Sequence, residues 1–182
     1  MDPASRRQPA TRVAEGSEAG FAVRVRRSFM IFEHANEAGT ARLAARLASA
    51  LGVGDVVLLE GTLGAGKTAF SRALIRSVLG DPDALVASPT FTFSQIYNVE
   101  TLVVTHFDLY RVGEAAEVFD LGWDDAIADG VTLVEWPDRL QDLRPAEALT
   151  ITIELHPDVE EARTFHFSGP DAWANRLAGG VL

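Results

Sequence analysis

The fold is decided by residues 55–68, which read Asp-Val-Val-Leu-Leu-Glu-Gly-Thr-Leu-Gly-Ala-Gly-Lys-Thr. The first six residues form a short apolar run that is typical of a strand buried in a parallel sheet. The next eight match G-x-x-x-x-G-K-[ST], the pattern of a phosphate-binding loop. Residues 69–79 have helical character, so the stretch predicts a strand, a phosphate loop and a helix in succession.

Each residue type in this loop has a physical reason. Gly61, Gly64 and Gly66 allow backbone conformations and a close approach that a Cβ atom would block. The loop N–H groups and the start of the helix then point at phosphate oxygens. Lys67 supplies a positive charge near the β- and γ-phosphates, and Thr68 offers its hydroxyl to Mg²⁺. A glycine-rich turn with a chance lysine is the alternative, which the flanking strand and helix disfavour.

Two carboxylates end apolar strands further along the chain. Asp108 closes residues 102–108, and Glu135 closes residues 131–135. Because the carboxyl ends of parallel strands share the rim that carries the phosphate loop, both are candidates to hold Mg²⁺ or to orient water. The sequence leaves open which of them touches the metal, and a surface or helix-capping acid is the alternative for each. His106 shares a strand face with Asp108, and we interpret it as a core or supporting histidine.

Residues 88–91 read Ser-Pro-Thr-Phe and lie between the phosphate-loop helix and the next strand. Two hydroxyls beside a proline suit a loop that orders when a γ-phosphate and Mg²⁺ are present. An ordinary turn is the favoured interpretation from the residues alone.

The rest of the chain alternates strand-like and helix-like segments. Strands are expected at residues 21–32, 55–60, 90–97, 101–107, 131–136, 148–155 and 163–168, and helices at 36–51, 69–79 and 114–128, the last as one helix or two short ones. This order predicts an α/β fold resembling P-loop NTPases, a three-layer sandwich around a central, mostly parallel but mixed sheet. We expect a disordered extension over residues 1–22, one ATPase domain over 23–170, and a short helix or tail over 171–182.

Charge and composition restrict the possible partners. The net charge is −10, and residues 1–30 carry six Arg against three acids, so the remainder carries −13. A body this acidic is a poor binder of nucleic-acid phosphate. The chain has no cysteine, which fits a reducing compartment, and it shows no apolar run long enough to span a bilayer. We expect a cytoplasmic protein without membrane contact.

Several motifs together carry a resemblance that covers residues 35–168. They are the phosphate loop at 61–68, Ser-Pro-Thr-Phe at 88–91, His-Phe-Asp-Leu-Tyr-Arg at 106–111, the segment 117–122 and Val-Glu-Trp-Pro at 134–137. In this order and spacing the chain resembles the TsaE (YjeE) family of small ATPases that support tRNA threonylcarbamoyladenosine synthesis. The resemblance implies slow ATP hydrolysis with Mg²⁺. It also implies partnership with TsaB and with TsaD, which transfers the threonylcarbamoyl group, so that the chain resets or regulates their complex and meets tRNA only through it.

The resemblance also implies roles for individual residues. Lys67, Asp108 and Glu135 would be catalytic, Thr68, Glu135 and Asp108 would hold the metal, and Trp136 would lie beside the site. Nucleotide contacts would come from Thr40, Gly61, Leu63, Gly64, Ala65, Gly66, Lys67, Thr68, Ala69, Thr90 and Arg163. For Arg163, a solvated charge beside Glu160 and Glu161 is the alternative.

Two rival functions remain open at this stage. A small-molecule kinase would also need the phosphate loop and Mg²⁺, but it usually carries a lid with clustered arginines. The arginines after Lys67 are scattered in this sequence. A non-catalytic module, in which ATP only orders a binding surface, is the second rival.

Overall fold

The structure is a computed structural model that describes residues 28–99 and 102–178. The extension expected over residues 1–22 lies outside the described residues. The elements, in chain order, are β1 (Met30–Ala35), α1 (Glu37–Ala48), β2 (Val56–Glu60), α2 (Lys67–Leu79), β3 (Ser94–Val99), β4 (Leu102–Asp108), α3 (Glu117–Asp120), α4 (Trp123–Asp129), β5 (Val131–Glu135), the 3₁₀ segment η1 (Pro137–Leu143), β6 (Leu149–Leu155), β7 (Arg163–Ser168) and α5 (Asp171–Ala178).

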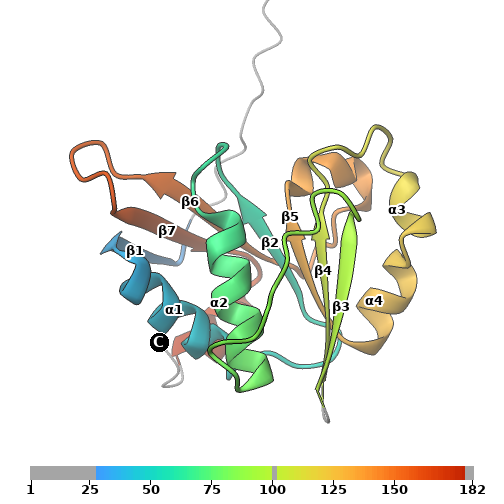
Figure 1. Ribbon diagram of the computed structural model, residues 1–182, viewed down its shortest axis with the longest axis horizontal. Helices are drawn as coiled ribbons and strands as arrows, with labels where there is room; N and C mark the ends of the chain where they lie inside the picture. Colours follow the sequence, from blue (N-terminus) through green and yellow to red (C-terminus); the bar gives the residue numbers. More distant parts are fainter. Residues whose placement is uncertain (1–27, 100–101, 179–182) are drawn as a thin grey trace, which may run out of the picture.

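The described strands form one sheet with the order β1-β7-β6-β2-β5-β4-β3 (Figure 1). The four central strands β6, β2, β5 and β4 are parallel to one another. The outer strands β3, β7 and β1 add by antiparallel pairing. The predicted mixed sheet is therefore confirmed, and its parallel part is the centre, where β2 and β5 bring the phosphate loop beside Glu135.

Local sequence fixes where the two main helices begin and end. The side chain of Asn36 caps α1 by accepting a hydrogen bond of 2.9 Å from the N–H of Gly39, which satisfies one of the free donors of the first turn. Helix α2 follows Gly66 and stops at Gly80, whose left-handed backbone (φ 66°) suits a residue without a Cβ. None of the described helices is long and apolar enough to cross a membrane.

Helices cover both faces of the sheet, and each face has its own core. One core joins α1, α2 and α5 to the sheet and contains Phe70, Leu74, Phe165 and Trp173 among others. The other lies under α3, α4 and η1 and centres on Phe107 and Trp123, whose rings meet edge to face at 5.5 Å. Figure 1 shows α1 and α2 together on one side and α3 and α4 on the other. This arrangement confirms the predicted three-layer α/β fold.

Some predicted boundaries were wrong. The strand expected over residues 90–97 begins only at Ser94, because Thr90 lies in a turn and Phe93 has a positive φ of 63°. The first strand is Met30–Ala35 instead of residues 21–32, of which 21–27 lie outside the described residues. The region 114–128 contains two short helices, separated by Gly122 with φ 83°. The sequence analysis did not predict η1.

Gly130 offers a test of the packing between β4 and β5. A Cβ atom at this position would lie 2.3 Å from the backbone oxygen of Val103. We expect Gly130→Ala to lower the free energy of unfolding by about 1–3 kcal/mol, as overpacking does. Urea titration measures the change. Gly52→Ala is the matched control, because a Cβ there meets nothing within 4 Å, and equal losses in both variants would contradict the steric explanation.

Candidate nucleotide site

The phosphate loop is shaped by tight backbone packing. Gly61 has a φ of 141°, and a Cβ atom there would lie 2.5 Å from the backbone oxygen of Ile153. Gly66, which directly precedes α2, has a φ of 112°. Both positions therefore require glycine. The loop runs from the end of β2 to the start of α2, as the sequence predicted.

Behind the loop, Glu60 fixes the end of β2. One carboxylate oxygen accepts a hydrogen bond of 3.0 Å from Thr152, and the other pairs with Arg144, which also donates to Thr150 at 3.0 Å. Burial and the nearby charge of Glu60 raise the pKa of Asp138 above its ordinary value, although Arg144, Arg139 and Lys67 act against the shift. Glu60, Arg144, Thr150 and Thr152 thus form one hydrogen-bonded network behind the loop.

Lys67 is folded back onto its own loop. Its ammonium donates hydrogen bonds to the backbone oxygens of Gly61 (2.7 Å) and Thr62 (2.8 Å) and lies 3.7 Å from the centre of the Trp136 ring. Only 4% of the residue is exposed. Burial lowers the pKa of Lys67 from its ordinary value, although the carboxylates of Glu135, Asp108 and Asp138 act in the opposite direction. The Lys67 ammonium is therefore held by neutral acceptors and an aromatic face.

Trp136, whose ring contacts the Lys67 ammonium, has an unfavourable backbone conformation. Its φ of 60° and ψ of 52° are in the left-handed region, which costs a bulky residue about 1–3 kcal/mol. Its ring lies 4.9 Å from that of Tyr110 as well as under the Lys67 ammonium. Such strain persists only where the surroundings determine it, and it is concentrated at functional sites.

The carboxylate of Glu135 lies within hydrogen-bond distance of three polar side chains. Its Oε2 accepts a hydrogen bond of 2.8 Å from the Thr68 hydroxyl, and its Oε1 lies 3.0 Å from the Ser71 hydroxyl and 2.9 Å from Nε2 of His106. The residue is 1% exposed. Burial raises the pKa of Glu135, but the hydrogen bond and charge of His106 and the two hydroxyls outweigh it, so that the pKa lies below its ordinary value of 4.5. The carboxylate is thus stabilised in its charged form.

Asp108 lies next to Glu135 on the neighbouring strand, since the two are register partners of β4 and β5. One oxygen accepts a hydrogen bond of 2.7 Å from the hydroxyl of Thr90, and the other accepts one of 3.1 Å from the N–H of Tyr110. The Thr90 hydroxyl also lies 2.8 Å from that of Ser88. The Ser-Pro-Thr segment therefore contacts the candidate metal site directly.

Two basic side chains attach the residues just before the Ser-Pro-Thr segment to α2. Arg72 donates from Nε to the backbone oxygen of Val86 (3.0 Å), and Arg76 donates from Nε to that of Ala84 (3.0 Å). The two arginines are one turn apart on the same helix, so the chain from Ala84 to Val86 follows the helix surface toward Thr90.

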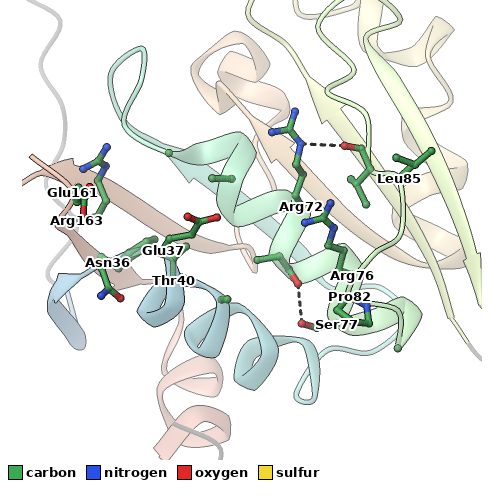
Figure 2. Close-up of a pocket in the computed structure, with 17 residues that line it drawn as sticks. Asn36, Glu37, Thr40, Arg72, Arg76, Ser77, Pro82, Leu85, Glu161 and Arg163 are labelled. Atoms are coloured by element: carbon green, nitrogen blue, oxygen red, sulfur yellow. Dashed lines mark hydrogen bonds between the residues drawn. The ribbon is translucent and has the colours of Figure 1, made fainter.

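Two cavities meet at the start of α2. The smaller, of about 310 Å³, is lined by predicted site residues with Tyr110, Arg111 and Trp136; the predicted ones are Leu63, Gly64, Gly66, Lys67, Thr68, Ala69, Thr90, Asp108 and Glu135. The larger, of about 970 Å³, contains Thr40 and Arg163 and shares Gly66 and Ala69 with the first. Figure 2 shows its walls, with Asn36, Glu37 and Thr40 at the start of α1 and Arg72 and Arg76 on α2. The predicted residues are thus divided between two adjoining compartments.

Arg163 supports the loop from the side. Its Nε donates to the backbone oxygen of Ala65 (2.9 Å), and its Nη1 donates to those of Glu160 (2.7 Å) and Ala162 (2.9 Å). Ala65 is fully buried. Neither Gly61 nor Ala65 lines either cavity, so these two predicted residues shape the loop from behind.

The oxygen atoms of the smaller cavity suit a hard cation. Thr68, Glu135 and Asp108 offer hydroxyl and carboxylate oxygens, the ligand type that Mg²⁺ prefers. Within residues 28–99 and 102–178, no group of three or more His, Cys, Asp or Glu side chains forms a ready metal site. These side chains therefore fit an ion that brings phosphate and water ligands of its own.

Sequence reasoning missed Ser71, which contacts Glu135 from α2. A signal was present, because Ser71 lies four residues after Lys67 and so on the same helix face. His106 was assigned a supporting role near Asp108, but its hydrogen bond goes to Glu135. The alternation of side chains along β4 predicted the correct face for His106. It could not identify the hydrogen-bond partner, Glu135, because that residue lies on the neighbouring strand β5.

Comparisons with known proteins agree on one family. The model of "Threonylcarbamoyl adenosine biosynthesis protein TsaE" matches residues 34–165. A Rickettsia felis protein named tRNA threonylcarbamoyladenosine biosynthesis protein TsaE is 36% identical over 66% of this chain and 70% of its own length. A Bacillus subtilis protein of the same name is 41% identical over 62% and 69%. The crystal structure of Bacillus subtilis YdiB has a TM-score of 0.64 and 29% identity, covering 82% of this chain and 91% of its own.

The hydrogen bonds to Glu135 predict a specific pH dependence of stability. The pKa of Glu135 is lowered in the folded protein from its ordinary value of 4.5. The stability that its charged form contributes is therefore fully present above this ordinary value and is lost as the pH falls through the folded pKa. We expect Glu135→Gln to be less stable than the parent at pH 7 by about 1–3 kcal/mol, and this difference to shrink below about pH 4.

Urea unfolding between pH 7 and pH 3 measures this difference. Glu33→Gln, at an exposed position on β1, is the control and should behave like the parent throughout. A deficit of Glu135→Gln that stays constant over this pH range would show that the carboxylate is not held in its charged form.

Proposed function

The chain belongs to the TsaE family, and from this premise we propose that it binds ATP with Mg²⁺ and hydrolyses it during the biosynthesis of threonylcarbamoyladenosine in tRNA. The observation that carries the proposal is one cavity in which a phosphate loop with its lysine faces two strand-end carboxylates. This arrangement unites the parts that phosphoryl transfer requires, namely a phosphate cradle, a cation and oxygen ligands for a metal.

The phosphates of ATP fit the smaller cavity. The Lys67 ammonium is bonded there to two neutral backbone oxygens. A phosphate oxygen is the stronger acceptor, because its negative charge attracts the ammonium more strongly than a neutral carbonyl oxygen does. We expect nucleotide binding to draw the ammonium away from Gly61 and Thr62 and toward the β- and γ-phosphates.

Mg²⁺ would be held by oxygen ligands of the smaller cavity. Thr68 and Glu135 are the residues proposed to hold it, since the hydroxyl of Thr68 already bonds to Glu135. Asp108, whose carboxylate bonds to Thr90, lies next to them and would orient the attacking water or complete the metal shell. When bound, Mg²⁺ would neutralise the charge that develops on the transferred phosphoryl group.

The base and ribose of ATP fit the larger cavity, which opens from the same helix start. Thr40 lies on one wall, and Arg163 lies beside the loop. In this proposal Arg163 acts first on the loop backbone, because its guanidinium is already bonded to three carbonyl oxygens. Its contribution to nucleotide binding would then be to hold the loop in shape.

We further propose that the protein acts on TsaB and TsaD and meets tRNA only through them, in the cytoplasm. The family resemblance and the charge of the chain support this. Outside residues 1–30 the chain carries −13, which disfavours direct binding to tRNA phosphates. Hydrolysis would be slow and would reset or regulate the complex, and transfer of the threonylcarbamoyl group would remain with TsaD.

Removal of the Lys67 ammonium tests the proposal. We expect Lys67→Ala to lower ATP hydrolysis at least about 10²-fold, because this charge is proposed to act on the transferring phosphoryl group, and to abolish Mg²⁺-ATP-dependent assembly with TsaB and TsaD. Hydrolysis is measured as phosphate release and assembly by size-exclusion chromatography.

The same two assays include a control variant, and their results can favour either rival function. Arg42→Ala, on the exposed face of α1, should retain both activities. Rapid ADP release that depends on a small acceptor, without assembly, would support a kinase instead. Assembly that persists in Glu135→Ala after hydrolysis is lost would support a nucleotide-gated binding module.

A further inference from the structure

One oxygen of Glu135 is held from behind by groups that do not face the cavity. Oε1 lies 2.9 Å from Nε2 of His106 on β4 and 3.0 Å from the Ser71 hydroxyl on α2. Both residues are fully buried. Neither lines the smaller cavity, whereas Glu135 and Thr68 do. His106 and Ser71 therefore reach the site only through the carboxylate.

The chemistry of the contact fixes the direction of the hydrogen bond. A carboxylate can only accept, so Nε2 of His106 carries the hydrogen and donates it to Oε1. The Ser71 hydroxyl has a single hydrogen and lies 3.0 Å from both Oε1 and the backbone oxygen of Lys67. It can therefore satisfy only one of these acceptors at a time. Nε2 of His106, in contrast, has no acceptor other than Oε1 among the described hydrogen bonds.

Packing alone does not explain a histidine at this position. Its other ring nitrogen, Nδ1, is buried without a hydrogen-bond partner among the described residues. Leaving a buried polar atom unpaired is unfavourable, whereas an apolar side chain of similar shape would carry no such cost. The ring thus leaves one of its two nitrogens unpaired, and its one described hydrogen bond goes to Glu135.

We propose that His106 is a positioning residue for Glu135. By holding Oε1, the imidazole directs Oε2 toward Thr68 and the Mg²⁺-nucleotide, much as a carboxylate or carbonyl behind a metal ligand sets the orientation of that ligand. The proposal rests on the proposed function, because it assigns His106 a role in Mg²⁺-dependent hydrolysis.

Two isosteric variants separate positioning from simple packing. The amide nitrogen of Gln can reach the place of Nε2, whereas that of Asn corresponds to Nδ1. We expect His106→Asn to lower kcat about 10–100-fold and to raise the Mg²⁺ concentration for half-maximal activity. Its KM for ATP should stay within about threefold of the parent value, because the phosphate loop is untouched. His106→Gln should recover most of the lost kcat. Equal losses in both variants would overturn the proposal.

Measurements without turnover complete the test. Thermal unfolding without nucleotide should give His106→Leu a Tm below that of the parent, because the buried carboxylate of Glu135 loses a hydrogen-bond donor, and its hydrolysis should be impaired as in His106→Asn. The gain in Tm on adding Mg²⁺ and ADP should be smaller in His106→Leu than in the parent. A large fall in the nucleotide-free Tm with normal hydrolysis would show a structural role only and overturn the proposal.

Thr132→Val is the matched control. Thr132 is also fully buried, lies on β5, and has a hydroxyl without a partner in the described part of the chain, but it does not contact Glu135. It should match the parent in kcat, KM and Mg²⁺ dependence, and a similar loss of kcat there would overturn the specific role of His106. A parent protein with no Mg²⁺-dependent hydrolysis or nucleotide binding would overturn the proposed function itself, whereas an active parent with a fully active His106→Asn would overturn only the positioning role.

Discussion

The buried carboxylate of Glu135 is the constraint on which the site depends. An ionised carboxylate in a protein interior costs several kcal/mol unless hydrogen bonds compensate for the water it loses. Here the compensation comes from two different elements, with hydroxyls of Thr68 and Ser71 on α2 and the ring of His106 on β4. These bonds form together only if α2 lies over the sheet at one height and one rotation. Because α2 begins at the phosphate loop, the need to satisfy Glu135 also places the loop.

The positive charge of the site, on Lys67, is also stabilised by contacts within the protein. The Lys67 ammonium bonds to the loop carbonyls and lies under the ring of Trp136, and Trp136 accepts a left-handed backbone to provide that ring. The opposite charges of Lys67 and Glu135 are therefore each held by a separate set of contacts. Under the proposed function, a bound nucleotide would replace the contacts of Lys67 and leave those of Glu135 in place.

Much of this could be predicted from the sequence, because the decisive signals are local. The phosphate loop is specified by glycines at positions 61 and 66, where backbone geometry excludes other residues, and Asp108 and Glu135 follow from their places at strand ends. What failed depends on tertiary contacts. The turn at residues 90–93 has residues that favour a strand, but the bond from Thr90 to Asp108 and the positive φ of Phe93 override that preference.

The role of single side chains was also hard to predict when it depends on a partner distant in sequence. Ser71 is separated from Glu135 by 64 residues, and only the sheet order brings them together. The nucleotide contact expected for Arg163 stays a prediction, and its described bonds, which the sequence did not indicate, go to the backbone of the loop and of the preceding turn. A sequence shows which residues can bond, but the choice among possible acceptors is made by packing.

Under the proposed function, the two carboxylates would also link the nucleotide to the protein surface. Asp108 and Glu135 are register partners on adjacent strands, yet each bonds to a hydroxyl of a different segment, Thr90 before β3 and Thr68 on α2. A metal that takes an oxygen from Asp108 competes with Thr90 for it, and a metal that uses the Thr68 hydroxyl leaves its bond to Glu135 in place. The segment before β3 is thus the part that must respond. Arg72 and Arg76 hold that segment to α2 only as far as Val86, and Phe91, directly after Thr90, is 78% exposed. If a metal binds as proposed, a change in its ligands would have a short physical route to this exposed apolar side chain, where a partner protein could sense it.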